Sequence, residues 1–238
     1  MADNTSNRPG ALIIGGTSGI GRAVAQALAV RGDRVIIAGR DAERAATIAN
    51  GIGMDVTGIA VDLGKPETIA ESLAGVGTIK HLVISAIDRD ANTIRDYDIR
   101  RALNLVTLKL VGYAETIHTL IPRFTNDASI VLLGGLAKDR PYPGSTTVST
   151  VNGGIVGMTH TLAKELGPIR VNGVHPGIIR DTETWSGKPA EFLEALMERT
   201  PAGRLVATAD VVGAITFLLD NKGVNGVDLV VDGGWLLT

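Results

Sequence analysis

The sequence contains no cysteine. This absence excludes disulfides, metal sites built on thiolates and cysteine nucleophiles. An excess of either charge is also lacking, since the formal net charge is only −2, and nothing favours binding to nucleic acid or to an anionic membrane. No apolar run approaches the roughly 18 residues that span a bilayer, and the polar start MADNTSNRPG has no apolar signal-peptide core. We therefore expect a soluble, cytoplasmic protein.

What the chain does contain favours an α/β protein. Hydrophobic residues make up 45% of it, which is enough for a core and argues against disorder, and 30 glycines suit many tight turns. Short apolar runs alternate with longer helical patterns, as a doubly wound parallel sheet requires. The expected strands are 11–14, 35–37, 58–61, 81–85, 129–133, 170–174 and 228–231.

Helical patterns connect these runs. The first helix is expected from Gly19 to Gly32, with Val30 among its apolar residues. Further helices are expected over 41–50, 66–73, 94–120, 145–166 and 209–219, and the polar segment 180–200 is expected to cross over a binding site. No repeat or linker interrupts the pattern, so we expect a single domain over residues 1–238, with a flexible N-terminus at 1–9. The predicted fold class is an α/β Rossmann-type doubly wound parallel sheet of about seven strands with helices on both faces.

Three glycines, Gly15, Gly19 and Gly21, follow the first expected strand in the pattern GxxxGxG. A turn this tight needs backbone conformations that only glycine adopts at low cost, and the missing side chains let a pyrophosphate approach the main chain. The helix that opens at Gly19 directs unpaired N–H groups and its positive dipole end toward that anion. A glycine turn can also merely connect a strand to a helix, but the complete strand–turn–helix–strand unit over residues 11–40 favours a dinucleotide site.

Four separated segments carry a resemblance to a known family: GGTSGIG at 15–21, Asp62-Leu63, LAKELGPIRVNGVHPG at 162–177 and VNGVDLVVDGG at 224–234. In this order they resemble the short-chain dehydrogenase/reductase family across nearly the whole chain. The resemblance implies a single Rossmann domain, a homotetramer or dimer, and a bound NAD or NADP.

The resemblance also implies which residues touch the cofactor. Asp62 would hydrogen-bond the adenine, although an aspartate here can equally cap a helix. Ile179 would meet the nicotinamide carboxamide. The full set of expected cofactor contacts is Gly15, Thr17, Ser18, Gly19, Ile20, Gly21, Arg40, Asp62, Leu63, Ser85, Ala86, Asn152, Pro176, Gly177 and Ile179.

The choice between the two cofactors can be argued from charge. Sites specific for NAD place an acidic residue at the end of the second strand, where it accepts hydrogen bonds from the ribose. This chain has Gly39 there, followed by Arg40. A guanidinium pairs with a 2′-phosphate through two hydrogen bonds, whereas a carboxylate would repel it. NADP(H) is therefore the predicted cofactor, the alternative being that Arg40 is only a solvated arginine before a helix.

The catalytic motif of the family has no counterpart in this chain. Family members usually carry YxxxK on the helix after the fifth strand, and a serine 13 residues before the tyrosine. With NGGIVGMTHTLAKEL as the register, the lysine position is Asn152, the tyrosine position is Val148 and the serine position is Gly135. None of the three tyrosines has a lysine four residues later. We therefore expect an atypical active site.

Three residues are candidates for the missing catalytic chemistry. Lys109 occupies the position of the family's fourth catalytic residue, an asparagine, better than Asn104 does, and only one of the two can face the site because they lie five residues apart on a helix. A buried lysine with a lowered pKa can donate a proton; the alternative is a lysine that snorkels off the helix.

The other two candidates are Asn152 and His175. Asn152 can hydrogen-bond ribose hydroxyls as a neutral group. His175, just before Pro176-Gly177, suits proton transfer near neutral pH, or is simply a hydrogen-bonded histidine at a strand end. The histidines do not cluster with carboxylates in the sequence, so no metal site is expected.

Three functions remain open. The first is an NADP(H)-dependent oxidoreductase that transfers hydride to or from an activated carbonyl, a quinone or an imine-like small molecule. The second is a non-redox enzyme on the same scaffold, such as a cyclase, isomerase or lyase. The third is a non-catalytic NADP(H)-binding regulatory subunit. We favour the first, because redox use of an intact cofactor site is the simplest reading.

Overall fold

The computed structural model describes residues 8–88 and 90–238. The flexible N-terminus predicted for residues 1–9 therefore lies, except for its last two residues, outside the described part of the chain.

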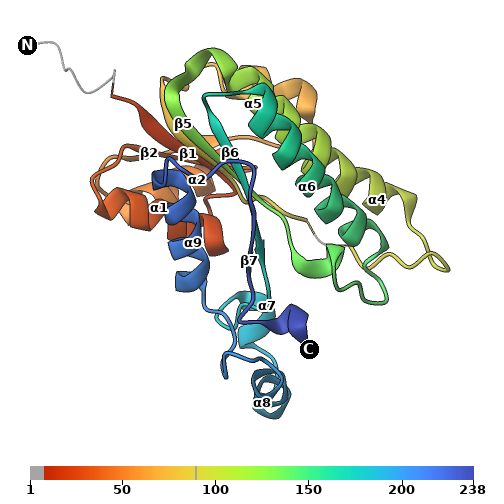
Figure 1. The fold of residues 1–238 in the computed structure, drawn as a ribbon. Coiled ribbons are helices and arrows are strands. Elements are labelled where there is room, and N and C mark those ends of the chain that lie inside the picture. Colours follow the sequence, from red (N-terminus) through yellow and green to blue (C-terminus); the bar gives the residue numbers. More distant parts are fainter. Residues whose placement is uncertain (1–7, 89) are drawn as a thin grey trace, which may run out of the picture.

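A single parallel sheet of seven strands forms the centre of the molecule (Figure 1). The strand order is β3-β2-β1-β4-β5-β6-β7, which confirms the predicted doubly wound sheet. All seven expected strands are present: their ends shift by at most two residues, except that β5 begins five residues earlier than expected. Their bounds are β1 Gly10–Ile14, β2 Val35–Gly39, β3 Val56–Ala60, β4 Ile79–Ile84, β5 Phe124–Leu133, β6 Arg170–Pro176 and β7 Asp228–Val231.

Helices cover both faces of the sheet (Figure 1). On one face the apolar sides of α1 (Gly19–Val30), α2 (Ala42–Ile52) and α9 (Thr208–Asp220) pack in one buried cluster. On the other face a second cluster contains residues of α3 (Ile69–Ser72), α5 (Tyr113–Leu120) and α6 (Thr146–Glu165). Among the described helices, none combines the length and the apolar composition that a membrane span needs.

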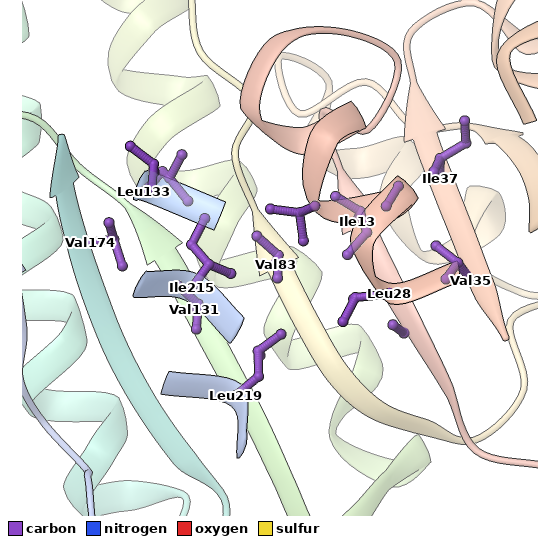
Figure 2. Close-up of a cluster of buried hydrophobic side chains, with 14 of the residues drawn as sticks. Ile13, Leu28, Val35, Ile37, Val83, Val131, Leu133, Val174, Ile215 and Leu219 are labelled. Carbon is purple, nitrogen blue, oxygen red and sulfur yellow. The ribbon is translucent and has the colours of Figure 1, made fainter. Parts of the chain in front are cut away.

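Successive strand residues point to opposite faces, so each strand feeds both clusters. Ile13 and Val83 contact α1 and α9 residues in the first cluster, which Figure 2 shows. Leu12 and Leu82 lie in the second cluster. Because both faces of the sheet are covered, the strands read as continuous apolar runs rather than alternating ones.

The structure corrects several expected helices. The helix expected over 94–120 begins only at Ile99, where α4 (Ile99–Val106) is capped by the side chain of Asp98. It then passes through a π-helical segment, Thr107–Gly112, into α5. Val30, at the end of α1, is 76% exposed and does not belong to the apolar face of that helix.

One more helix differs from expectation, and the segment expected to cross the site has helices of its own. The helix expected over 66–73 is a 3-10 turn, Pro66–Thr68, followed by the short α3. The segment 180–200 contains two helices, α7 (Glu183–Ser186) and α8 (Ala190–Glu198). A small apolar cluster of their own, which includes Leu193 and Leu196, holds these helices.

Candidate functional site

A cavity of about 410 Å³ opens at the carboxyl ends of the strands, next to β1 and β4. The strand order reverses between these two strands, and open α/β sheets bind ligands at such a point. The cavity is lined by Ile14, Gly15, Thr17, Ser18, Gly19, Ile20, Gly21, Gly39, Arg40, Val61, Asp62, Leu63, Ser85, Ala86, Ile87, Leu108, Thr182, Glu183 and Thr184.

The three glycines of the turn form a cradle for a phosphate. Gly15 has a φ of +84°, and a Cβ on it would lie 2.6 Å from the backbone nitrogen of Ala86. A Cβ on Gly21 would lie 2.3 Å from the carbonyl oxygen of Gly15. Gly19 has a φ of +50°, and a Cβ there would meet nothing within 4 Å, so its backbone faces open space. Since α1 begins at Gly19, this space lies at a helix N-terminus, where a phosphate is bound well. The turn therefore fits a dinucleotide pyrophosphate.

The end of β2 leaves no room for an acidic side chain. A Cβ on Gly39 would lie 2.7 Å from the Cγ2 atom of Thr17. Arg40, the next residue, is exposed and lines the cavity. The residue that follows the end of β2 therefore offers a guanidinium to the cavity, which suits a phosphate on the ribose.

Asp62 is not a helix N-cap, because the 3-10 turn that follows it is preceded by Lys65 at that position, and its contact with an adenine stays a prediction. Its Oδ1 atom accepts a hydrogen bond from the backbone N–H of Gly64 at 3.0 Å, and its Oδ2 atom lies 3.8 Å from the Lys65 amine. The same side chain lines the cavity. It therefore stabilises the turn after β3 and still presents a carboxylate to a ligand.

Four of the expected cofactor contacts do not line this cavity: Asn152, Pro176, Gly177 and Ile179. Ile179 is only 6% exposed and lies in the core cluster that contains α1 and α9. Instead, Thr182, Glu183 and Thr184 reach the cavity from the segment after β6. The sequence indicated that this segment crosses the site, but no motif marked these three residues.

The positions of the family's serine and lysine lie against each other. Asn152 on α6 is 3% exposed, and a Cβ on Gly135 would lie 2.9 Å from its Nδ2 atom. The asparagine amide therefore occupies the space beside Gly135 that a serine side chain would need. Among the described residues, no group donates a hydrogen bond to the buried Oδ1 atom of Asn152. Val148, one turn before Asn152, is half-buried.

Lys109 lies behind the cavity rather than in it. The side chain is 1% exposed, and its amine donates hydrogen bonds to the carbonyl of Leu133 and, at 3.1 Å, to the hydroxyl of Tyr113. Burial lowers the pKa of Lys109 to about 7. Asn104 points elsewhere, as its spacing from Lys109 predicts, and donates to Asp88 at 2.9 Å. It lines a second cavity, of about 640 Å³, which Tyr142 borders on the other side.

His175 is fully buried at the end of β6 and is not a lining residue of the cavity. Its Nδ1 atom accepts a hydrogen bond from the backbone N–H of Gly135 at 3.2 Å, so the ring proton lies on Nε2. The Nε2 atom is 2.8 Å from a carboxylate oxygen of Asp228, whose other oxygen is 2.8 Å from His160. The expectation that the histidines do not cluster with carboxylates is therefore wrong for these two. His175 therefore has the environment of the alternative given for it, a hydrogen-bonded histidine at a strand end, and its ring holds the backbone of Gly135 in place.

No cluster of three or more His, Asp or Glu side chains within residues 8–88 and 90–238 is arranged to hold a metal ion. The tyrosine that sequence reasoning missed is Tyr113. It is fully buried on α5, and its hydroxyl donates a hydrogen bond to the carbonyl of Ala86 at 2.8 Å. Lys109 lies four residues before Tyr113, whereas the YxxxK pattern places the lysine four residues after the tyrosine.

Comparison with known proteins identifies the family to which this chain belongs. Residues 14–236 match the family described as Enoyl-(Acyl carrier protein) reductase. A solved short chain dehydrogenase/reductase family protein is 29% identical, covers 98% of this chain and 99% of its own, and superposes with a TM-score of 0.82. The chain belongs to the short-chain dehydrogenase/reductase family.

Two curated relatives show the range of this family. The 3-oxoacyl-[acyl-carrier-protein] reductase of Mus musculus is 33% identical over 95% of this chain and 97% of its own length. Carbonyl reductase family member 4 of Danio rerio is 32% identical over 94% of this chain and 96% of its own. Both names describe reductases, so the resemblance read from the sequence is confirmed and the chain is placed among oxidoreductases.

Proposed function

We propose that this protein is an NADP(H)-dependent oxidoreductase with an atypical active site. The single observation that carries the proposal is the cavity at the strand-order reversal, where the glycine turn, Arg40 and Asp62 line one continuous space. The nicotinamide cofactor supplies or accepts a hydride at its ring carbon 4, which is the chemistry expected of the family. The names of the reductase relatives support the same class of reaction.

Each part of the cavity has a defined task in this proposal. The backbone at Gly19 and the N-terminus of α1 bind the pyrophosphate. Arg40 binds the 2′-phosphate, and Asp62 accepts a hydrogen bond from the adenine. Thr182 and Thr184 cover the cofactor from the segment after β6 and exclude water.

The substrate must be one that needs little acid catalysis. Val148 and Gly135 have no proton to give, and Asn152 is neutral at all working pH values. A positioned general acid contributes roughly 10²- to 10⁴-fold in rate, or about 3–5 kcal/mol of barrier. Lys109 and His175 are both sealed behind the cavity, so water or the substrate supplies the proton. An activated carbonyl, a quinone or an imine-like small molecule meets this requirement.

Cofactor binding provides the first test. We expect NADPH to bind more tightly than NADH by isothermal titration calorimetry, and Arg40→Ala to remove most of this difference. Loss of one charge-assisted pairing corresponds to roughly 10- to 100-fold in Kd. Arg44→Ala, an exposed arginine on α2 outside the cavity, is the matched control and should bind NADPH normally. Equal NADPH affinity in both variants would contradict the role of Arg40.

Turnover provides the second test. With NADPH deuterated at carbon 4, deuterium should appear in the product from a panel of quinones, activated ketones and imines. One observation favours a second candidate, a non-catalytic NADP(H)-binding subunit: Gly135, Val148 and Asn152 supply no acid. Tight NADPH binding with no deuterium transfer, but with a change in oligomeric state, would support that candidate. The predicted homodimer or homotetramer stays a prediction that sedimentation can test.

A further inference from the structure

Lys109 and Tyr113 are a buried polar pair that the proposed function leaves without a task. They lie one turn apart across the π-helical segment, and they are 1% and 0% exposed. The amine also lies 4.9 Å from the centre of the Tyr113 ring. Replacing a buried polar pair by apolar side chains of the same shape is often neutral or stabilising. Stability alone is therefore a weak reason for this chain to bury an amine and a phenol together.

The pair connects two strand ends through three hydrogen bonds. The Lys109 amine donates to the carbonyl of Leu133, the last residue of β5, and to the Tyr113 hydroxyl. The Tyr113 hydroxyl donates to the carbonyl of Ala86, two residues after the end of β4. The backbones of β4 and β5 already pair as far as Ile84 and Leu132. The side-chain pair adds a connection beyond this ladder, because it ties the Ala86 carbonyl to the end of β5.

The carbonyl of Ala86 belongs to the wall of the cofactor cavity. Ala86 lines the cavity, and its backbone lies close to Gly15: a Cβ on Gly15 would be 2.6 Å from the backbone nitrogen of Ala86. The π-helical segment contacts the wall as well, since a Cβ on Gly112 would lie 2.4 Å from the carbonyl of Leu63. π-Helical segments often occur at functional sites. A change in the pair would therefore move the cavity wall beside β4.

A dinucleotide crosses the sheet edge at the strand-order reversal. Arg40 and Asp62 follow β2 and β3, so the adenine half lies on that side of β1. The nicotinamide half then lies over the ends of β4 and β5, which the pair joins. We propose that Lys109 and Tyr113 are positioning residues that fix the wall beneath the nicotinamide half of the cofactor. This inference rests on the proposed function.

The positioning role of Lys109 and Tyr113 can be tested by comparing the binding of two ligands, only one of which has the nicotinamide half. The variants are Lys109→Met and Tyr113→Phe, and the ligands are NADPH and adenosine 2′,5′-bisphosphate, which lacks the nicotinamide half. We expect both variants to weaken NADPH binding by roughly 3- to 30-fold, the range for one or two buried hydrogen bonds. Their affinity for adenosine 2′,5′-bisphosphate should stay unchanged. The emission of bound NADPH should also shift, because the nicotinamide environment changes.

Thr116→Val is the matched control. Thr116 is also fully buried on α5, and its hydroxyl donates to the carbonyl of Gly112 without reaching the cavity. The Thr116→Val variant should alter the urea unfolding midpoint but leave the affinity for both ligands unchanged. Arg40→Ala should weaken both ligands together.

The outcomes separate the inference from the proposed function. If the unmodified protein binds neither ligand, the proposed function is wrong. If it binds both, and the pair variants weaken both equally or neither, the positioning role is wrong. Should Lys109→Met fail to fold, Tyr113→Phe decides alone, since it removes a single oxygen atom.

Discussion

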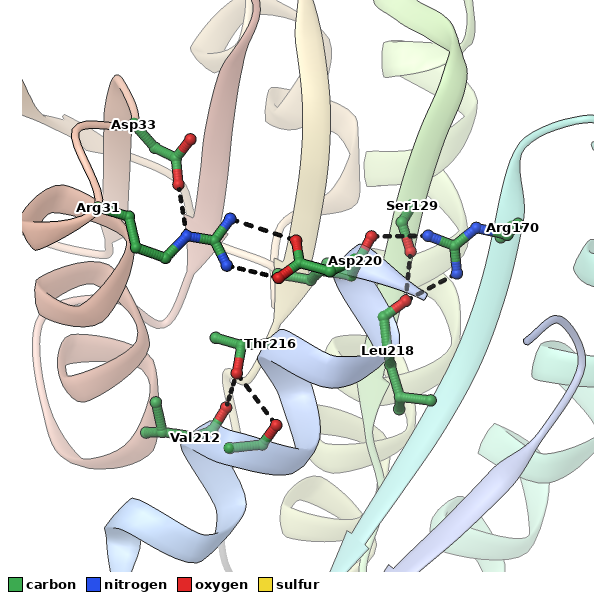
Figure 3. Close-up of polar contacts among 10 residues, drawn as sticks. Arg31, Asp33, Ser129, Arg170, Val212, Thr216, Leu218 and Asp220 are labelled. Carbon is green, nitrogen blue, oxygen red and sulfur yellow. Dashed lines mark hydrogen bonds and ion pairs between the residues drawn. The ribbon is translucent and has the colours of Figure 1, made fainter. Parts of the chain in front are cut away.

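At the amino-terminal edge of the sheet, where the strands begin, charged side chains pair with other groups of the chain. At the carboxyl edge, where the strands end, polar groups line a cavity instead. The guanidinium of Arg170, only 7% exposed, donates to the carbonyl of Leu218 at 2.7 Å (Figure 3). It also donates to the carbonyls of Leu219 at 2.6 Å and Val224 at 3.0 Å. It thereby satisfies carbonyls at the end of α9 that a helix leaves unpaired.

Beside it, Arg31 forms an ion pair with Asp220 at 2.7 Å and with Asp33 at 3.2 Å (Figure 3). At the opposite edge the backbone of Gly19 faces open space at the start of α1. Polar groups that find partners inside the chain contribute to stability, whereas groups left without partners are available to a ligand. Mutations at the two edges should therefore affect different measurements.

The largest effect is expected from Arg170→Met. This variant removes the guanidinium donor from the carbonyls of Leu218, Leu219 and Val224, although Leu218 keeps the Ser129 hydroxyl and Val224 keeps the Asn172 amide. We expect the free energy of unfolding to fall by about 2–4 kcal/mol through the lost charge-assisted hydrogen bonds, as measured by urea denaturation. NADPH affinity should be unchanged while the protein is folded. A large loss of affinity would contradict the expectation that mutations at this edge affect stability and not binding.

The pH dependence of stability should depend on His81, at the start of β4 on the same edge. Burial, together with the charge of Lys80, lowers the pKa of His81 to about 4. The unfolded chain then binds more protons than the folded one between pH 6.5 and 4, so stability falls as the pH falls through this window. The loss should reach at most about 3 kcal/mol.

His81→Leu tests this expectation in urea titrations at several pH values. The variant should flatten the stability profile between pH 6.5 and 4. His118→Gln, at an exposed position on α5, is the matched control and should leave the profile unchanged. A His81→Leu profile as steep as that of the unmodified protein would assign the pH dependence to other groups.

At the carboxyl edge, Gly19→Ala and Gly32→Ala form a matched pair. Both glycines have a positive φ, +50° and +85°, and a Cβ on either would meet nothing within 4 Å. Each substitution should therefore cost about 1–2 kcal/mol of stability through backbone strain. Only the methyl group at Gly19 would enter the cavity, so only that variant should weaken NADPH binding, by roughly 10- to 100-fold. Similar affinities would mean that the phosphate does not approach this turn.

The smallest effect is expected from the ion pair of Arg31 and Asp220, whose side chains are 37% and 53% exposed. Asp220→Asn should lower the free energy of unfolding by less than about 1 kcal/mol. The loss should shrink further at high salt, because screening weakens exposed pairs. A larger, salt-independent loss in urea denaturation would show that the pair belongs to the Arg170 network.

Strand positions and the glycine turn could be predicted from the sequence because both are local. A buried parallel strand is a short apolar run, and a φ above zero at Gly15 and Gly19 is a property of the residue type. The start of α4 was missed because Ile94 continues an apolar pattern, while the cap that decides the boundary, Asp98, is held by Asn92 through two hydrogen bonds. These hydrogen bonds join residues six positions apart in an irregular segment, which the helical spacing of apolar residues does not report.

The amino-acid sequence by itself determined the doubly wound sheet, the phosphate cradle and the basic residue beside it, because each depends on residues close together in the chain. Only the tertiary structure decided which polar groups face the cavity. It buried Lys109 and His175 away from the cavity, paired Lys109 with Tyr113, and brought Thr182 and Thr184 to the cavity. The physical reason is that helical periodicity assigns a residue to a face of its helix, whereas the cavity is built from six segments whose relative placement depends on the packing of the whole sheet.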